Sequence, residues 1–423
     1  MPGSVSLLFS ESRRIVLAGT LDTKGEEIFY LKGLFEAAGA NPLLLDLGVH
    51  GEGSFTPEVT RHEIAKLGGK AIQELLSIGD RGVAVTTMEA GFARWVRLNA
   101  GRIAGILSIG GSGGTTIATS GMRELPIGIP KFMVSTVASG NTRQFVQTSD
   151  ISMQYSVADF SGLNRFTRLI LRNAAAAMLG MVGLAEPLSS GALPGNQPDS
   201  ESRPLAAATM YGVTTPCVNQ VREILDRNGF ELMIFHANGA GGQAMERLAH
   251  DGFLTGVLDI TTAELGAELL GGHFSAGPDR LKIAGELGLP QVISVGAMDM
   301  VAFGPRSTVP QSLTSRNLYV HNSNVTLMRT NQEENTRLGQ ELVKKMSAAK
   351  GPVSILLPLR GLSALDAAGQ PFEDVPANKA LFAAVREAAA GHVRVIEVDA
   401  HINDSIFAEA LATEFLRLVN PQT

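Results

Sequence analysis

The chain has a single cysteine, Cys217, so neither an intrachain disulfide nor a cysteine-rich zinc module can form. No apolar run reaches the ~18–20 residues that a membrane-spanning helix needs. Residues 4–9 are too few for the apolar part of a secretion signal, and the nearby charges follow them instead of preceding them. We therefore expect a cytoplasmic protein that does not interact with membranes.

Positive charge is also scarce. Lys and Arg number 35 against 41 Asp and Glu, which gives a formal net charge of −6. A general nucleic-acid-binding protein needs an excess of basic residues to neutralise phosphates, so we expect no nucleic-acid partner. A local basic pocket for one small anion remains compatible with this balance.

Glycine, by contrast, is in excess. The 47 glycines make up about 11% of the 423 residues, against a usual ~7%. They are clustered, and the clusters follow short apolar runs. This placement puts glycine-rich loops where predicted strands end.

The stretch from residue 184 to residue 204 separates two halves. Its sequence, LAEPLSSGALPGNQPDSESRP, is rich in Pro, Ser and Gly and has no apolar period, which is typical of a linker. On either side, short apolar runs bounded by glycine alternate with helical patterns, as in buried parallel sheets. We therefore predict two Rossmann-like, doubly wound α/β domains with mostly parallel sheets, over residues 1–183 and 205–423.

The apolar runs and helical periods predict individual elements. Strands are expected at residues 14–18, 43–45, 82–86, 103–109, 131–135, 206–211, 231–235, 255–260, 291–295, 353–357 and 393–398. Helices are expected near residues 25–38, 57–77, 163–182, 216–228, 243–250, 262–270, 332–349, 378–390 and 404–418.

Three polar loops of the first half follow predicted strands. Because ligands bind beyond the carboxyl ends of parallel strands, and glycine amides at a helix start attract anions, these loops predict a phosphate site. Its candidate residues are Gly19, Thr20, Asp22, Thr23, Lys24, Gly110, Gly111, Ser112, Gly113, Gly114, Thr115, Ser139, Gly140, Asn141 and Thr142. Lys24 could pair with a phosphate, and Asp22 could hold Mg²⁺ through water. The alternative is that the glycines only make tight turns.

The loop at residues 110–114 matches no standard nucleotide motif, since both G-x-G-x-x-G and G-x-x-x-x-G-K-[ST] are absent. It does satisfy G-x-S-x-G, with Ser112 in the position of a nucleophile on a strand-to-helix turn. A serine hydrolase is therefore an alternative. Four glycines among five small residues favour a phosphate-binding loop over a strained nucleophile turn.

The second half has its own group of polar residues near predicted strand ends. The loop at residues 235–243 is another candidate anion site, and a catalytic set is possible. The candidate catalytic residues are His236, Glu264, Asp299, His321 and Arg360. An imidazole beside a carboxylate could act as a general base or metal ligand, and an arginine could hold a carboxylate or phosphate. The structural alternatives are a helix-start role for Glu264 and hydrogen-bonded structural histidines.

Several motifs together resemble the family of the tomato mosaic virus resistance protein, an ATP-binding inhibitor of tobamovirus RNA replication. The motifs are GTLDTK (19–24), SIGGSGGT (108–115), VASGNT (137–142), FHANGAGGQAME (235–246), LDITTAEL (258–265), GAMDMVAFGP (296–305), NLYVHNSNVTLMRTN (317–331), PLRGLSALD (358–366) and DAHIND (399–404). The chain resembles a bacterial-type member that covers only the N-terminal, ATP-binding part. The resemblance implies two Rossmann-like halves, ATP and Mg²⁺ binding, and self-association as a dimer or higher homo-oligomer. It also implies a separate partner, a phosphoenolpyruvate-hydrolase-like TIM barrel.

Three functions follow as hypotheses. The first is a cytoplasmic ATP-binding protein whose first-half loops hold the phosphates. The second is a metabolic enzyme, a hydrolase or lyase, acting on a small phosphorylated or carboxylated metabolite at the second-half residues. The third is a non-catalytic regulatory subunit that binds nucleotide and docks a partner enzyme.

Overall fold

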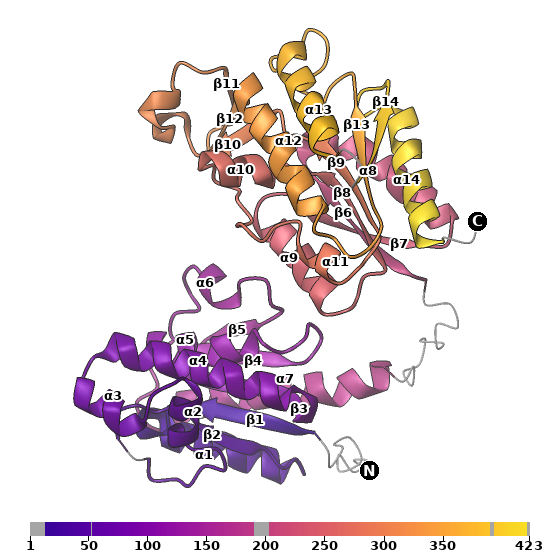
Figure 1. Cartoon of the computed structure of the whole chain (residues 1–423). Helices are drawn as coiled ribbons and strands as arrows, with labels where there is room; N and C mark the ends of the chain where they lie inside the picture. Colours follow the sequence, from indigo (N-terminus) through magenta and orange to yellow (C-terminus); the bar gives the residue numbers. More distant parts are fainter. Residues whose placement is uncertain (1–12, 52, 190–202, 390–392, 421–423) are drawn as a thin grey trace. The chain divides into compact units, whose positions relative to one another are not determined.

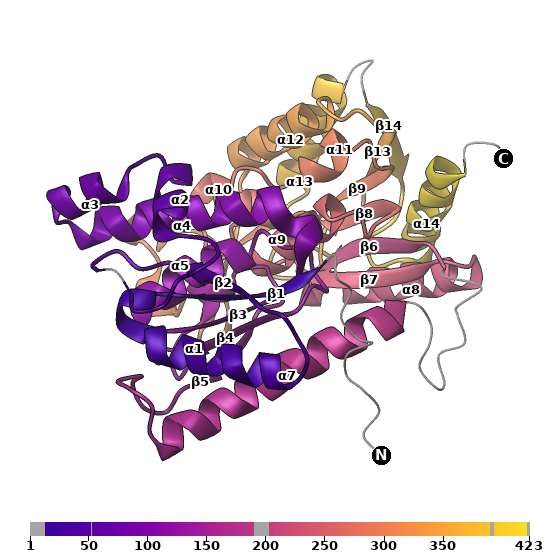
Figure 2. The same ribbon diagram turned by 90° about the horizontal axis from the view of Figure 1, so that it is seen from below.

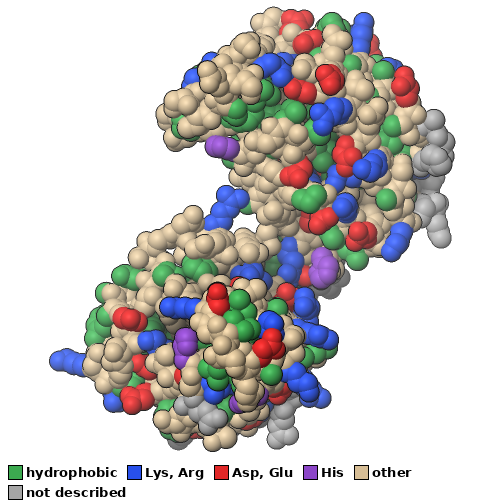
Figure 3. All heavy atoms as spheres, turned by 60° about the vertical axis from the view of Figure 1, so that its left-hand side comes forward, with side chains coloured by type: hydrophobic (Ala, Val, Ile, Leu, Met, Phe, Trp, Pro, Cys, Tyr) green, Lys and Arg blue, Asp and Glu red, His purple; other side chains and the backbone are tan. Residues whose placement is uncertain are grey.

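The structure, a computed structural model, describes residues 13–51, 53–189, 203–389 and 393–420. They form two α/β units that divide after residue 200 (Figure 1). Within the described ranges, no helix is both long and apolar enough to cross a membrane. On the face drawn in Figure 3, acidic and basic side chains are interspersed over each unit. The two units are described separately below.

The first unit is built on a five-stranded parallel sheet in the order β2-β1-β3-β4-β5. Its strands are β1 (Arg14–Gly19), β2 (Leu43–Asp46), β3 (Ile103–Gly110), β4 (Lys131–Ser135) and β5 (Ser152–Tyr155). Its helices are α1 (Leu21–Ala37), α2 (Arg61–Leu67), α3 (Ile72–Ile78), α4 (Arg81–Asn99), α5 (Ser112–Met122), α6 (Arg143–Val146) and α7 (Arg165–Ser189), with a 3₁₀ turn at Ala100–Arg102.

Alternation along β1 explains how both faces of this sheet are covered. Successive side chains of a strand point to opposite faces. Ile15 and Leu17 pack with α1 and α7, whereas Val16 and Ala18 pack with α2 to α5. Figure 2 shows the two groups of helices on opposite sides of the sheet. Strand β1 is therefore apolar on both faces, as the sequence predicts for a parallel sheet.

The second unit has a six-stranded parallel sheet in the order β14-β13-β9-β8-β6-β7. Its strands are β6 (Leu205–Met210), β7 (Glu231–His236), β8 (Gly256–Thr261), β9 (Gln291–Gly296), β13 (Val353–Pro358) and β14 (Arg394–Val398). Its helices are α8 (Thr215–Arg227), α9 (Ala240–His250), α10 (Glu264–Leu270), α11 (Ile283–Glu286), α12 (Gln332–Met346), α13 (Val375–Ala389) and α14 (Ser405–Val419), with 3₁₀ turns at Gly212–Thr214, Arg306–Thr308 and Gln311–Leu313. Helices α8 and α14 pack on one face, and α12 and α13 pack on the other.

The prediction of two Rossmann-like α/β units with largely parallel sheets is confirmed. One smaller sheet was not predicted. It is antiparallel, in the order β10-β12-β11, and comprises β10 (Met300–Phe303), β11 (Leu318–Asn322) and β12 (Val325–Arg329). The short edge strand β5 was also missed, because its sequence, SMQY, is neither continuously apolar nor cleanly alternating.

The predicted strand at residues 82–86 is wrong, because these residues form the start of α4. Its β-branched residues favour a strand locally, but Asp80 caps a helix by accepting the amide of Val83 at 3.0 Å. Close packing against α2 then fixes the helix, since a side chain at Gly91 would overlap the carbonyl of Ile64. Tertiary packing overrides local propensity here.

Two other boundaries differ from the prediction. The expected helix at residues 57–77 is two helices, α2 and α3, separated at Gly68 and Gly69. Helix α7 continues to Ser189, so the first residues of the predicted linker are helical. Residues 190–202 of that linker lie outside the described residues.

Candidate functional site

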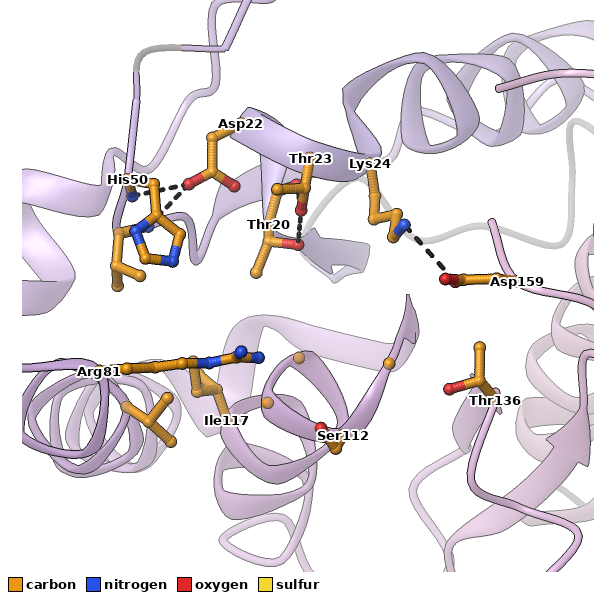
Figure 4. Close-up of a pocket in the computed structure, with 15 residues that line it drawn as sticks. Thr20, Asp22, Thr23, Lys24, His50, Arg81, Ser112, Ile117, Thr136 and Asp159 are labelled. Carbon is orange, nitrogen blue, oxygen red and sulfur yellow. Dashed lines mark hydrogen bonds and ion pairs between the residues drawn. The ribbon is translucent and has the colours of Figure 1, made fainter. Parts of the chain in front are cut away.

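A cavity of about 470 Å³ lies in the first unit at the carboxyl ends of β1 and β3. In the order β2-β1-β3-β4-β5, the connections leave β1 and β3 in opposite directions, which is the position where doubly wound sheets bind ligands. The cavity is lined by Thr20, Asp22, Thr23, Lys24, Val49, His50, Arg81, Val85, Gly111, Ser112, Gly113, Gly114, Ile117, Thr136 and Asp159 (Figure 4).

The glycine loop, residues 110–114, joins β3 to α5 and forms one wall. Apolar residues of α5 such as Ile117 and Met122 are buried against the sheet, so the helix starts at the sheet edge. None of the described residues accepts a hydrogen bond from the amides of Ser112, Gly113 or Gly114. Free amides at a helix start carry partial positive charge. This wall is therefore suited to an anion.

The loop from Thr20 to Lys24 forms the opposite wall, at the start of α1. The hydroxyls of Thr20 and Thr23 lie 2.7 Å apart. The ammonium of Lys24 donates to the carbonyl of Phe160 and lies 3.7 Å from the Asp159 carboxylate. Lys24 thus lines the cavity but already has two partners within the unit.

Asp22 holds the loop that follows β2. Its Oδ2 accepts the amides of Val49 at 3.0 Å and His50 at 2.8 Å. Its Oδ1 is buried and has no hydrogen-bond partner among the described residues. A Cβ on Gly48 would lie only 2.8 Å from the Asp22 carboxyl carbon, so this carboxylate is packed tightly against the loop.

The carboxylates of the cavity determine whether it could hold a metal ion. Among the described residues, no group of three or more His, Cys, Asp or Glu side chains is placed to hold a metal ion. Mg²⁺, however, needs only one or two carboxylates when a substrate supplies phosphate oxygens. The cavity offers Asp22, which is tied to two amides, and Asp159, whose side chain is 74% exposed.

Seven of the cavity residues were not predicted from the sequence. They are Val49, His50, Arg81, Val85, Ile117, Thr136 and Asp159. Arg81 and Val85 were missed because the start of α4 was read as a strand. Asp159 comes from the segment after β5, a strand that was not recognised.

Several predicted residues lie outside the cavity lining. Gly19 and Gly110 end their strands, and Gly110 allows close approach of Gly114. Thr115 is buried, and its hydroxyl lies 2.6 Å from that of Ser135. The residues after β4 also lie elsewhere: Asn141 uses its side chain to accept the amide of Arg143. Ser139, Gly140, Asn141 and Thr142 are not among the lining residues.

Ser112 lines the cavity together with His50, Asp22 and Asp159, but its hydroxyl is not paired with any of them. No described histidine or carboxylate hydrogen-bonds to its hydroxyl. Its carbonyl accepts the Thr116 hydroxyl within α5. A nucleophilic serine needs an adjacent base that is held by a third group, so the geometry does not favour the hydrolase alternative.

In the second unit, Glu264 fills the predicted anion-binding loop. Its Oε1 accepts the amides of Gly239 at 2.7 Å and Gly242 at 3.1 Å, at the start of α9. Gly239 has a φ of +85°, a conformation that glycine adopts readily. Glu264 is 1% exposed, and its Oε2 accepts Arg280 Nε at 2.5 Å. An internal carboxylate therefore already occupies the loop where an external anion was expected.

The other candidate catalytic residues lie in separate environments. His236 ends β7 with its ring 5.2 Å from that of Tyr211, and burial lowers its pKa. Asp299 is fully buried, and its Oδ2 accepts the Ser363 hydroxyl at 2.8 Å. Arg360 is exposed and forms a bidentate pair with Asp399 at 2.7 Å.

His321 was expected just past a predicted strand. It instead lies within β11 of the small antiparallel sheet and is exposed. The structure describes all five candidates, and no hydrogen bond or ion pair joins any two of them. They do not form a connected catalytic group.

Comparison with known proteins identifies the family. Residues 13–187 match the N-terminal domain of Uncharacterised protein family (UPF0261), and residues 203–419 match its C-terminal domain. The chain belongs to the UPF0261 family. A UPF0261 protein of Clostridium tetani is 45% identical over 96% of this chain and 99% of its own length. A UPF0261 protein of Rhizobium meliloti is 43% identical over 97% of this chain and all of its own length.

The tomato proteins are more distant UPF0261 homologues. ToMV resistance protein Tm-1(GCR237) of Solanum lycopersicum is 36% identical over 97% of this chain, which spans 56% of the tomato protein. The chain thus corresponds to about half of the tomato protein. The expectation that it covers only an N-terminal part of its relatives is wrong for these bacterial relatives, which are matched over nearly their whole length. Among solved structures, a Streptomyces glycosyltransferase in complex with thymidine diphosphate matches at 12% identity, covering 93% of this chain and 98% of that one. Its TM-score of 0.18 is too low to establish a shared fold.

Proposed function

We propose that this UPF0261 protein binds ATP in the first unit, with the phosphates at the start of α5. The observation that carries the proposal is the set of free amides of Ser112, Gly113 and Gly114 facing a cavity at the β1/β3 edge. Phosphates bind readily at such helix starts. The identity of the ligand as ATP is supported by the sequence resemblance described above.

The remaining cavity walls suit a nucleotide. A volume of about 470 Å³ falls within the range of small-molecule sites, roughly 300–1,000 Å³. Threonine and serine hydroxyls line it beside the amides, and Val49, Val85 and Ile117 supply apolar surface. A ligand with an anionic group at the start of α5 and an apolar part against these three side chains would match both the polar and the apolar walls of the cavity.

Magnesium fits this proposal as a companion of the phosphates. Asp159 is the more available carboxylate, because its side chain is exposed and Asp22 is already bonded to two amides. Bound Mg²⁺ would neutralise phosphate charge beside Asp159. Either residue would hold the ion together with phosphate oxygens and water.

Titration calorimetry on the purified chain tests the proposal directly. ATP is titrated with and without Mg²⁺, and adenosine serves as the control that lacks phosphates. Micromolar ATP affinity that is lost with adenosine is the expected result. An affinity for adenosine equal to that for ATP, or no heat with ATP, would refute a phosphate site.

Replacing Gly113 with leucine should weaken ATP binding at least 50-fold. A Cβ at this position would be 3.4 Å from Arg81 Nη2, and the longer side chain would fill the space in front of the amides. Gly33→Leu is the matched control, since an added Cβ at Gly33 has no neighbour within 4 Å. Both variants should keep the wild-type melting temperature within a few degrees. Equal ATP affinity in Gly113→Leu and Gly33→Leu would contradict the assignment.

The other hypotheses make different predictions. A metabolic enzyme in the second unit would need His236, Glu264, Asp299, His321 and Arg360 to act together, and no observation favours this. A regulatory subunit would bind ATP and co-purify with a separate TIM-barrel protein without turnover of its own. Self-association and the barrel partner stay predictions, which sedimentation and co-purification would test.

A further inference from the structure

We infer that a groove of the first unit, between α1 and α7, is a docking site for an acidic, amphipathic helix of a partner protein. The groove has a volume of about 540 Å³ and is here called the arginine groove. It is lined by Tyr30, Arg165, Phe166, Arg168, Leu169 and Arg172. None of these residues lines the cavity at the carboxyl ends of β1 and β3. The inference therefore concerns a second site, which does not depend on nucleotide binding.

The start of α7 explains why the three arginines face outward. The helix begins after Asn164, whose Oδ1 accepts the amide of Phe166 at 2.9 Å. The apolar face of α7 is buried beside α1 on one side of the sheet, the side on which Figure 2 shows both helices. With 3.6 residues per turn, Arg165, Arg168 and Arg172 then share the opposite face. All three are exposed.

The guanidinium groups of these arginines have no carboxylate partner within the described ranges. None of them makes a hydrogen bond or an ion pair there, and the Arg168 guanidinium lies over the Tyr30 ring, 5.2 Å from its centroid. Arg165 and Arg168 lie in the first turn of α7, which contains no acidic residue. The positive end of the helix dipole disfavours cations in that turn. In a chain with a net charge of −6, an external anion would stabilise this unpaired positive charge.

Apolar side chains lie between the charges. Phe166 is 41% exposed and Leu169 is 50% exposed. Arginine and aromatic residues are enriched at protein interfaces and among the residues that contribute most to binding. A small inorganic anion would leave the apolar surface in water. The groove therefore matches a partner that combines negative charge with apolar side chains.

The spacing of the arginines favours a helix as the occupant. At a rise of 1.5 Å per residue, Arg168 and Arg172 lie about 4.5 and 10.5 Å along α7 from Arg165. A partner helix along α7 offers the same spacings when acidic residues occupy its positions i, i+3 and i+7. One face of an extended strand offers steps of about 6.6 Å, which match less well. Beyond Arg172, the exposed residues Ala176 and Gly180 are small and leave room for a second helix to approach.

Fluorescence anisotropy with a designed peptide tests this inference on the full chain. The probe is an alanine-based helix of about 18 residues, long enough to be helical in water, which carries a neutral fluorophore. It has glutamates at positions i, i+3 and i+7 and leucines beside them, and a control peptide has glutamines instead of the glutamates. We expect saturable binding of the glutamate peptide and at least 10-fold weaker binding of the glutamine peptide. The affinity should fall as NaCl is raised from about 50 to about 300 mM.

Charge reversal separates docking from an effect on folding. Arg165→Glu/Arg172→Glu should bind the glutamate peptide at least 10-fold more weakly, and a peptide with lysines at those positions should bind this variant and not the wild type. Arg94→Glu/Arg102→Glu is the matched control, because both arginines are exposed, lie outside the groove and give the same change in net charge. It should bind the glutamate peptide within about twofold of wild type. Both variants should melt within a few degrees of wild type, since glutamate is favourable at a helix start.

Other occupants give different results. A uridine oligonucleotide and vesicles of phosphatidylserine are titrated in parallel with the peptides. If either binds the wild type more tightly than the glutamate peptide does, and Arg165→Glu/Arg172→Glu abolishes that binding, the groove serves a nucleic acid or a lipid surface and the inference fails. It also fails if the glutamate peptide shows no saturable binding, or binds both double variants equally.

Discussion

Replacing Arg280 with methionine is expected to lower the free energy of unfolding of the second unit by about 3–5 kcal/mol at pH 7. Breaking a buried ion pair by removing one partner has a cost of this size, because it leaves charge buried without compensation. Arg280 is 2% exposed and contacts three carboxylates. The variant would leave all three without their shared cation.

The geometry of this group explains the size of the effect. Arg280 forms a bidentate pair with Asp259 at 2.5 and 2.8 Å, and reaches Glu264 at 2.5 Å and Glu246 at 3.3 Å. Glu246 also accepts the amides of Leu281 and Ile283, at 2.6 and 3.0 Å. The arginine therefore connects β8, α9 and α10, together with the loop that carries it, in one network.

The pH dependence gives a second readout. Burial already raises the pKa of Glu246 and Glu264 in the wild type, against the opposing charge of Arg280. Without that charge these pKa values rise further, so the folded variant is relatively favoured when the carboxyls are protonated. The stability deficit of Arg280→Met should therefore shrink as the pH falls from 7 towards 5.

Urea unfolding followed by circular dichroism measures this effect. Trp95, the single tryptophan, lies in the first unit and provides a fluorescence reference for that unit. Arg386→Met is the matched control, since its pair with Glu397 is exposed on both sides. It should change stability by less than about 1 kcal/mol. A deficit in Arg280→Met no larger than in this control would show that the network contributes little.

The glycine loop of the first unit shows what sequence reasoning can reach. The apolar run before Gly110 predicts a parallel strand, and parallel strands of one sheet end at the same edge. From this it follows that the loops after β1 and β3 lie close together, and the structure brings Thr20, Lys24 and Gly113 to one cavity. This step needs only the common direction of the strands.

Arg81 shows where such reasoning stops. The residues after it favour a strand by local propensity, and the helix is decided by an Asp80 cap and by contacts with α2. Those contacts depend on close approach of Gly91 to Ile64, which no local pattern reveals. The cation was therefore not assigned to the cavity, although Asp80 followed by an apolar period was a usable signal for a helix start.

Glu264 illustrates the same limit at the second glycine loop. The loop at Gly239 and Gly242 has the composition of an anion site, and the anion is a carboxylate of the same chain. Composition cannot distinguish an internal anion from a ligand, because both satisfy the same amides. Only the folded structure identifies the occupant, because Glu264, after β8, reaches the loop after β7 although β6 lies between these two strands in the sheet.

Replacing Asp299 with asparagine is expected to remove a pH-dependent loss of stability. Burial is the main reason that the pKa of Asp299 rises from 3.8 to about 7, and the nearby Asp366 carboxyl adds to it. Asp299 is fully buried. Ser363 donates to its Oδ2 at 2.8 Å, and its Oδ1 has no hydrogen-bond partner among the described residues. The protonated acid is thus the favoured form in the folded state.

The sign follows from linkage. Below about pH 4 the carboxyl is protonated in both states and has no effect. Between about pH 4 and 7 the unfolded chain ionises while the folded chain keeps its proton, so stability falls as the pH rises, by at most about 1.4 kcal/mol per pH unit. Above pH 7 the loss is complete. Asparagine is neutral throughout, so the stability of Asp299→Asn relative to wild type should increase from pH 5 to pH 7 and then level off.

Urea unfolding of both proteins at pH 5, 6, 7 and 8 measures how the difference in their free energies of unfolding changes with pH. A constant difference caused by the new amide does not affect this slope. The total increase between pH 5 and 7 should approach 2–3 kcal/mol, by the same linkage, at roughly one proton per chain. Asp399→Asn is the control, because the pKa of exposed Asp399 is shifted in the opposite direction: the Arg360 guanidinium lowers it. Its difference from wild type should stay flat over this range, since Asp399 is ionised in both states above pH 5. A flat profile for Asp299→Asn as well would mean that Asp299 is ionised in the folded protein, with Arg329 as the neighbouring cation that stabilises it.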